Sequence, residues 1–258
     1  MTTALVHSWY LTERSIRNLL RQPWWIAISL AQPVIYLLFF GSLFGKVVEI
    51  PGFAAASYIT FLTPGVVIMT ALFGAGWAGM GAITIIERGI MDRFLTSPVS
   101  RSAIIVGSLA GTALTIVIQT FIVLAIGWVR GATYAGGPGG IAAVVAAAVL
   151  LALPIGALSL ATGLVLRRQE SVIGVVNMVL LPLMFLSSVF MAANLMPDWM
   201  QTVARYNPVD WAVSAARSAV AAEPDWSLIL SRLGLLAVLS VICIAVASGA
   251  FRSYQRSV

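Results

Sequence analysis

Residues 139–166 read GGIAAVVAAAVLLALPIGALSLATGLVL, a run without a single charged side chain. A helix needs about 20 apolar residues to cross the hydrocarbon core of a bilayer, so this run is long enough to span it. Five other long apolar stretches occupy residues 24–44, 58–83, 102–128, 172–194 and 227–250. Because lipid offers no hydrogen-bond partners, the backbone of each stretch is expected to be helical. The sequence therefore predicts an all-α integral membrane protein with six transmembrane helices in one domain, residues 1–258.

The composition excludes several classes of protein. Of the 258 residues, 60% are hydrophobic and 9% are charged, whereas soluble domains carry about 25% charged residues. This excludes a soluble enzyme and a disordered chain, and the long uniform runs exclude a transmembrane barrel, whose strands are short and alternating. The net charge is +6. The basic residues are nevertheless spread in twos and threes between apolar runs, so no nucleic-acid partner is expected.

Reactive side chains are scarce in this sequence. The one cysteine, Cys243, allows no internal disulfide, and the one histidine, His7, lies outside all six stretches. The stretches hold no Asp, Glu, Lys or His, and Arg232 is their one charged residue. We therefore expect no catalytic residues and no metal site. Carriers driven by protons or sodium generally place ionisable groups at membrane depth, so self-contained ion coupling is not expected, and any driving energy should come from outside this chain.

Two glycine-containing strings match nucleotide-binding motifs in letters alone. Residues 74–79 (GAGWAG) lie inside an apolar stretch with no strand before them. Small residues at this spacing are typical of membrane helices that pack closely. Residues 41–46 (GSLFGK) are one residue short of a phosphate loop and lack the Ser or Thr that follows its lysine. We expect no nucleotide cofactor in this chain.

The basic residues favour one orientation in the membrane. With the N-terminus in the cytoplasm, the inner segments carry ten arginines and the outer segments carry four basic residues. This agrees with the positive-inside rule and predicts that both termini are cytoplasmic. Arginine dominates among the basic residues, and Ala and Gly are abundant, as is typical of GC-rich bacterial genomes.

Three segments outside the apolar stretches have a recognisable pattern. Residues 5–21 place Leu, Trp and Ile on one helical face and Arg on the other, which predicts an amphipathic interfacial helix; a plain basic segment is the alternative. Residues 136–140 (GGPGG) predict a flexible outer turn. The outer segment 195–226 is rich in Trp and Tyr, which favour the membrane interface. Its stretches 197–205 and 209–221 are predicted to be short interfacial helices.

The loop 85–101 between the second and third stretches is both charged and apolar. It contains the sequence ERGIMDRFLTSPVSR at residues 87–101. Four apolar residues recur at helical spacing, namely Ile90, Met91, Phe94 and Leu95. A short cytoplasmic helix with one apolar stripe is therefore predicted, and it should stop before Pro98. The alternative is a solvated loop whose charges only set the topology.

Three of these stretches resemble motifs of one family. Residues 87–101 resemble an inner loop in which E-x-G leads to R-x-L-x-[ST]-P-[VL]-[SP]-R. Residues 195–199 (LMPDW) are similar to an outer [LM]-P-x-W element, and residues 207–217 (NPVDWAVSAAR) to N-P-[LV]-x-[YW]-x-[VI]-x-[AG]-x-R. In this order, the motifs resemble the permease subunits of type-2 ABC exporters of the daunorubicin-resistance and nodulation type.

The resemblance implies partners and sites. The permease would work with a separate cytoplasmic ABC ATPase, which binds ATP and Mg²⁺, as two permeases (identical or paralogous) with two ATPases in a bacterial cytoplasmic membrane. The implied ATPase-coupling residues are Glu87, Arg88, Ile90, Met91, Asp92, Arg93, Phe94, Leu95, Thr96, Ser97 and Pro98. The residues of the outer-segment motif are Pro197, Trp199, Asn207, Pro208, Trp211 and Arg217.

The cargo pathway should be sought among the polar and aromatic side chains of the apolar stretches. The candidates for the pathway are Gln32, Phe39, Met69, Phe73, Gln119, Asn177, Phe185 and Phe190. A cavity lined by such residues would suit a lipophilic or amphiphilic cargo; the alternative is that they pack in the core or face lipid.

Four functions remain to be compared. The first is export of hydrophobic drugs by an ATP-driven machine, and the second is export of lipid-linked glycans or cell-wall precursors by the same machinery. The third is a scaffold subunit without cargo. The fourth is a membrane-embedded enzyme, and the shortage of ionisable residues in the apolar stretches disfavours it.

Overall fold

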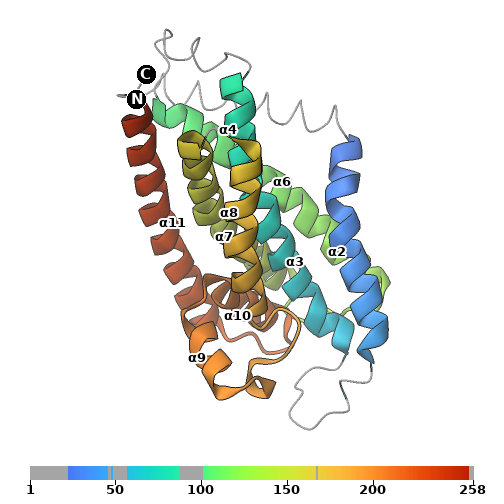
Figure 1. The fold of residues 1–258 in the computed structure, drawn as a ribbon. Coiled ribbons are helices and arrows are strands. Elements are labelled where there is room, and N and C mark those ends of the chain that lie inside the picture. Colours follow the sequence, from blue (N-terminus) through green and yellow to red (C-terminus); the bar gives the residue numbers. More distant parts are fainter. Residues whose placement is uncertain (1–22, 46–47, 49–56, 88–100, 167, 256–258) are drawn as a thin grey trace.

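The computed structural model describes residues 23–45, 48, 57–87, 101–166 and 168–255, and this part of the chain consists of helices joined by turns and loops, without strands (Figure 1). The helices are α2 (Pro23–Leu43), α3 (Tyr58–Gly76), α4 (Ala78–Glu87), α6 (Arg101–Val129), α7 (Gly137–Leu166), α8 (Gln169–Phe185), the 3₁₀ turn η2 (Ala193–Leu195), α9 (Asp198–Tyr206), α10 (Pro208–Val220) and α11 (Trp226–Gln255). The predicted all-α class is confirmed. The predicted interfacial helix 5–21 lies outside the described residues.

Four helical stretches are long and apolar enough to cross a membrane. They are Tyr58–Gly81, Gly107–Val129, Gly137–Leu166 and Trp226–Gly249. Two further apolar helices, Ile28–Leu43 and Gln169–Phe185, are shorter. The architecture fits a multi-pass membrane protein, with an apolar helix within each of the six predicted stretches.

The predicted fifth span, 172–194, is wrong at its end. Helix α8 stops at Phe185, and residues 186–191 form turns and bends before η2. Pro182 supplies no backbone N–H to the helix, and the hydroxyl of Ser187 donates to the carbonyl of Met184 at 2.6 Å. Such local side-chain bonds compete with the helical ladder, so the helix ends about two turns early.

The predicted second span, 58–83, is two helices. Helix α3 ends at Gly76, Trp77 forms the junction, and α4 begins at Ala78. The hydroxyl of Ser159 on α7 donates to the carbonyl of Gly76 and accepts from the backbone N–H of Gly79 at 2.9 Å. A side chain from another helix is thus inserted into the backbone ladder, which is a common cause of helix breaks.

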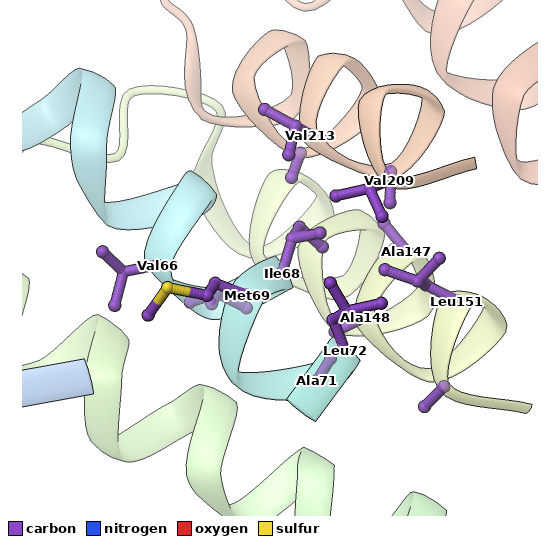
Figure 2. Close-up of a cluster of buried hydrophobic side chains, with 14 of the residues drawn as sticks. Val66, Ile68, Met69, Ala71, Leu72, Ala147, Ala148, Leu151, Val209 and Val213 are labelled. Atoms are coloured by element: carbon purple, nitrogen blue, oxygen red, sulfur yellow. The ribbon is translucent and has the colours of Figure 1, made fainter. Parts of the chain in front are cut away.

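Helix α7 is the central element of the bundle. It contacts α3, α4, α6, α8, α10 and α11, and Figure 1 shows it surrounded by its neighbours. Figure 2 shows buried side chains of α3, α7 and α10 packed together, among them Met69, Leu72, Leu151 and Val213. The α7 side of this contact includes the small residue Ala148, which lets the neighbouring helices approach closely.

Helix α10 is part of this core and does not rest on its surface. Val209, Ala212, Val213, Ala216 and Ala219 are completely buried against the bundle. The prediction of helices near 197–205 and 209–221 is confirmed by α9 and α10; that they rest on or dip into the outer leaflet stays a prediction. Its small apolar face packs on α3, α7 and α11.

The glycines of 136–140 permit a close contact, and the predicted turn is confirmed at Gly136 but is wrong from Gly137 onward, where the chain is helical. Helix α7 already begins at Gly137, where φ is +63°. A Cβ on Gly136 or Gly140 would lie 2.0 or 2.1 Å from the carbonyl oxygen of Ala219, so no other residue fits at these two positions. The C-terminal end of α10 therefore docks directly on the first turn of α7.

Several segments that are distant in sequence meet at this end of the bundle, here called the α10 end. The N–H of Thr133 donates to the hydroxyl of Thr60, and the N–H of Ala135 donates to the carbonyl of Val220, both at 3.1 Å. Figure 1 shows that α4 ends and α6 begins at the opposite end. The loops of the bundle are thus divided between two ends.

The string at 74–79 packs helices together, as predicted. A Cβ on Gly79 would lie 2.2 Å from the carbonyl oxygen of Ser159, and a Cβ on Gly163 would lie 2.5 Å from the carbonyl oxygen of Gly79. Helices α4 and α7 therefore touch backbone to backbone.

We predict that Gly163→Ala destabilises the protein, because the added methyl group forces α4 and α7 apart, at a cost of about 1 to 3 kcal/mol. The matched control is Gly234→Ala on α11, where a Cβ would meet nothing within 4 Å. The measurement is the thermal unfolding midpoint of the purified full chain. Equal midpoints for both variants would contradict the close contact.

Candidate functional site

Asn207 joins the start of α10 to the end of α8. Its side-chain oxygen accepts from the N–H of Val209 at 2.9 Å and caps α10. Its amide nitrogen donates to the carbonyls of Leu183 and Leu186 at 2.7 and 2.8 Å. Pro208 occupies the first turn of α10, where its missing N–H leaves no bond unmade. The Asn-Pro pair of the motif thus starts one helix and satisfies the last carbonyls of another.

Asp210 holds the turn that follows α8. One carboxylate oxygen accepts from the backbone N–H of Ser188 at 3.0 Å and from its hydroxyl at 2.5 Å. Both residues are buried. A buried carboxylate is stable only where hydrogen bonds or charges compensate it, and here the Ser188 donors do so.

Arg217 connects α10 to α3 and to the segment after α8. Its Nε donates to the carbonyl of Phe61 at 3.1 Å and an Nη donates to the carbonyl of Val189 at 2.8 Å. The guanidinium carbon lies 3.5 Å from the centroid of the Phe61 ring, which is a cation–π contact. A Cβ on Gly65 would lie 2.5 Å from the Val189 oxygen, so the glycine admits this carbonyl.

The charge on Arg217 persists at neutral pH. Burial lowers the pKa of its guanidinium to about 9, and the attraction of Asp210 and Tyr58 opposes that effect. Because this pKa stays above 7, the fork of donors remains charged and can hold two carbonyls and a ring together.

The remaining motif residues lie on the outside of this cluster. The indole N–H of Trp211 donates to the carbonyl of Arg205 at 2.6 Å, which fixes α9 to α10. Pro197 immediately precedes α9. Trp199 is 61% exposed on α9 and takes no part in the cluster. The side chains of this motif thus hold backbone segments in place. Among the described residues, no group of three or more metal-binding side chains occurs.

Four of the predicted pathway residues surround one cavity. Gln32 of α2, Met69 and Phe73 of α3, and Gln119 of α6 line a hollow of about 130 Å³ between these three helices. The amide nitrogen of Gln119 donates to the hydroxyl of Ser29 at 2.8 Å and so links α6 to α2.

The other four predicted pathway residues lie elsewhere. Phe39 faces a separate open hollow on the surface of α2. Phe190 belongs to an aromatic cluster with Tyr36 and Phe40. The amide of Asn177 donates to the carbonyl of Ile173 on its own helix, and Phe185 is exposed at the end of α8.

Glu87 is the last residue of α4, and the other predicted coupling residues, 88–98, lie outside the described residues. The helix that leads into them is nevertheless fixed. Through Gly79 and Ser159, α4 is attached to α7.

Three important residues were missed by sequence reasoning. Asp210 stands inside the quoted motif, and its position among apolar residues is a signal that could have marked it as buried. Ser188 and Ser159 are single hydroxyls in apolar runs, and nothing in their neighbouring sequence distinguishes them from other serines.

Comparison with known proteins gives a consistent result. The profile of a family described as ABC-2 type transporter matches residues 7–221. A daunorubicin resistance ABC transporter permease protein, DrrB1 of Streptomyces coeruleorubidus, is 29% identical over 219 residues, which cover 84% of this chain and 74% of the relative. The putative transport permease ycf38 of Porphyra purpurea is 28% identical over 84% of this chain and 74% of its own. That of Pyropia yezoensis is 27% identical over 80% and 71%.

We predict that Arg217→Lys lowers the stability of the protein by about 1 to 3 kcal/mol, because an ammonium group cannot bind two carbonyls in a fork and stack on Phe61. The matched control is Arg205→Lys on the exposed part of α9. Denaturant unfolding of both variants, followed by tryptophan fluorescence, measures the difference. A loss that is as large for Arg205→Lys would refute a specific role for Arg217.

Proposed function

The chain belongs to the ABC-2 type transporter family, and we propose that it is the permease subunit of an ATP-driven exporter of hydrophobic or amphiphilic, drug-like cargo. The energy would come from a separate cytoplasmic ABC ATPase that binds ATP and Mg²⁺. The drug-resistance permease among its relatives supports this cargo class. The low charge of the described interior supports it as well, because such a pathway favours molecules without ionised groups.

The observation that carries the proposal is the attachment of α4 to the centre of the bundle. The predicted coupling residues directly follow α4. Helix α4 touches α7 backbone to backbone at Gly79 and Gly163, and α7 in turn contacts six other helices. A push on the coupling segment would therefore move the bundle as a unit, as expected of packed elements that do not deform continuously.

The exposed apolar side chains of α2 and α8 also support assembly with a second permease copy. Helices α2 and α8 present stripes of exposed apolar side chains. These include Ile35, Leu38 and Phe39 on α2, and Val175, Met178 and Phe185 on α8. Such stripes suit lipid or another helix, and we propose that a second permease, identical or paralogous, covers part of them in an assembly of two permeases and two ATPases.

The proposed orientation places the α10 end outside a bacterial cytoplasmic membrane. The opposite end, both termini and the coupling segment then face the cytoplasm. The asymmetry of the arginines supports this assignment. Residues 5–21 would lie along the inner surface of the membrane.

The central experiment tests whether residues 90–95 dock on the ATPase. Phe94→Ala should weaken association with the ATPase by about 2 to 3 kcal/mol if the ring is buried there, because apolar anchors dominate interfaces. Arg93→Ala is the matched control and should mainly change the salt dependence. Co-purification and cargo-stimulated ATP hydrolysis are measured, with membrane insertion checked separately. Normal values for Phe94→Ala and for alanine at Ile90, Met91 and Leu95 would defeat the coupling proposal and favour a scaffold subunit.

The orientation is tested with single cysteines in a Cys243→Ala background. Ala222→Cys, at the α10 end, should react with an impermeant maleimide applied to intact cells, whereas Ser171→Cys, near the start of α8, should react only after the membrane is opened. Both positions are exposed on the isolated chain, and reaction of each cysteine in opened membranes is the control for its reactivity. The reverse pattern would invert the orientation.

A further inference from the structure

In the part of the chain that the structure describes, one buried amide oxygen between α2, α3 and α6 has no hydrogen-bond partner. Gln119 on α6 is 3% exposed, and its amide nitrogen is already engaged with the hydroxyl of Ser29. Within the described residues, its Oε1 accepts no hydrogen bond. A buried acceptor that is left unpaired is unfavourable and uncommon, so the group calls for a donor from outside the chain.

This oxygen adjoins the cavity between α2, α3 and α6. Gln119 and Gly74 both line the cavity. Gly74 has no side chain, and a Cβ built at this position would lie 3.4 Å from Oε1, which is van der Waals contact. Oε1 itself is covered, with less than 1 Å² of accessible surface. Because the last side-chain torsion of a glutamine is broad, a small rotation of the amide brings Oε1 to the cavity that Gln119 lines.

The rest of the lining combines apolar and aromatic side chains with the uncharged polar residues Ser29, Gln32 and Thr70. Met69 and Thr70 are buried at the inner side, whereas Ile28 and Trp77 are 52% and 40% exposed and mark the open side. The ring of Phe73 also lines the space. The lining includes no charged residue, and the volume is about 130 Å³. An apolar cavity of about 150 Å³ holds one benzene molecule, and this hollow is slightly smaller than that but open on one side.

We propose that this cavity binds a neutral molecule with an apolar body of about one ring and a hydroxyl group that donates a hydrogen bond to Oε1 of Gln119. The aromatic lining receives the ring, and the absence of charge in the lining excludes an ionised group. The proposal goes beyond the transport function, because binding requires neither ATP nor the ATPase. Water filling the cavity on its own is the competing occupant.

The test uses a matched pair of photoreactive probes on membranes that contain the full chain. One probe is a phenol that carries a trifluoromethyl diazirine, and the other is its methyl ether, which has no donor. After illumination, labelled peptides are mapped by mass spectrometry. Peptides that contain residues 69–77 should be labelled more by the phenol, by roughly 3- to 10-fold, which is the range expected for one hydrogen bond. Labelling of the exposed face of α11 corrects for partition into lipid.

Two variants assign the preference to Gln119. Gln119→Leu removes the acceptor and should reduce the ratio of phenol to ether labelling to about one. Gly74→Ala places a methyl group in ordinary contact with Oε1 and should reduce it as well, while leaving the fold intact. The control is Asn177→Leu, whose amide bonds to its own helix and lies outside the cavity lining.

Three results would overturn the proposal. The first is equal labelling by both probes in the wild-type protein, or stronger labelling by the ether, which would place a donor and not an acceptor at the cavity. The second is a preference for the phenol that survives in both Gln119→Leu and Gly74→Ala. The third is an unlabelled cavity, which would mean that water alone fills it.

Discussion

Backbone groups that are freed by a broken helix must find partners within the protein, because the lipid around it supplies none. This constraint accounts for three of the buried polar side chains of the bundle. Ser159 bonds to both sides of the break between α3 and α4, and Asn207 binds the last carbonyls of α8. Asp210 receives the N–H of the turn that follows. Ser159, Asn207 and Asp210 therefore act at points where the regular helical hydrogen bonds are interrupted.

The same constraint explains why glycine and alanine concentrate around α7. A helix that contacts six others needs small side chains, because each neighbouring helix must approach its backbone closely. Gly140 accepts the end of α10, and Gly163 accepts the backbone of α4. The small residues therefore set the distances in the bundle, and the larger side chains of α3, such as Leu72, fill the remaining space (Figure 2). The result is a firm centre to which the more exposed helices α2 and α8 are added.

Hydropathy located the apolar helices because the backbone N–H and C=O groups of a long uncharged run in lipid can form their hydrogen bonds only within a helix. It did not locate the break at Trp77, because the hydroxyl that causes it comes from Ser159, 83 residues beyond Gly76. The burial of α10 was also missed: its Asp210 and Arg217 look like surface charges until their partners on other segments are known. Of the predicted pathway residues, Gln119 and Gln32 were recognisable as rare polar groups in apolar runs, and the cavity they share depends on helix packing that no local pattern contains.

The hydrogen bonds of Arg217 can form only late in the synthesis of the chain. Its partners, the carbonyls of Phe61 and Val189, are synthesised well before residue 217 leaves the ribosome. Until then, no arginine joins the first turn of α3 to the segment after α8. The first turn of α7 also lacks α10, which docks on it in the folded protein. The helices that enter the membrane early are therefore held together by one that arrives late. A chain truncated before α10 would be left open at this end, in a form that quality-control proteases can recognise.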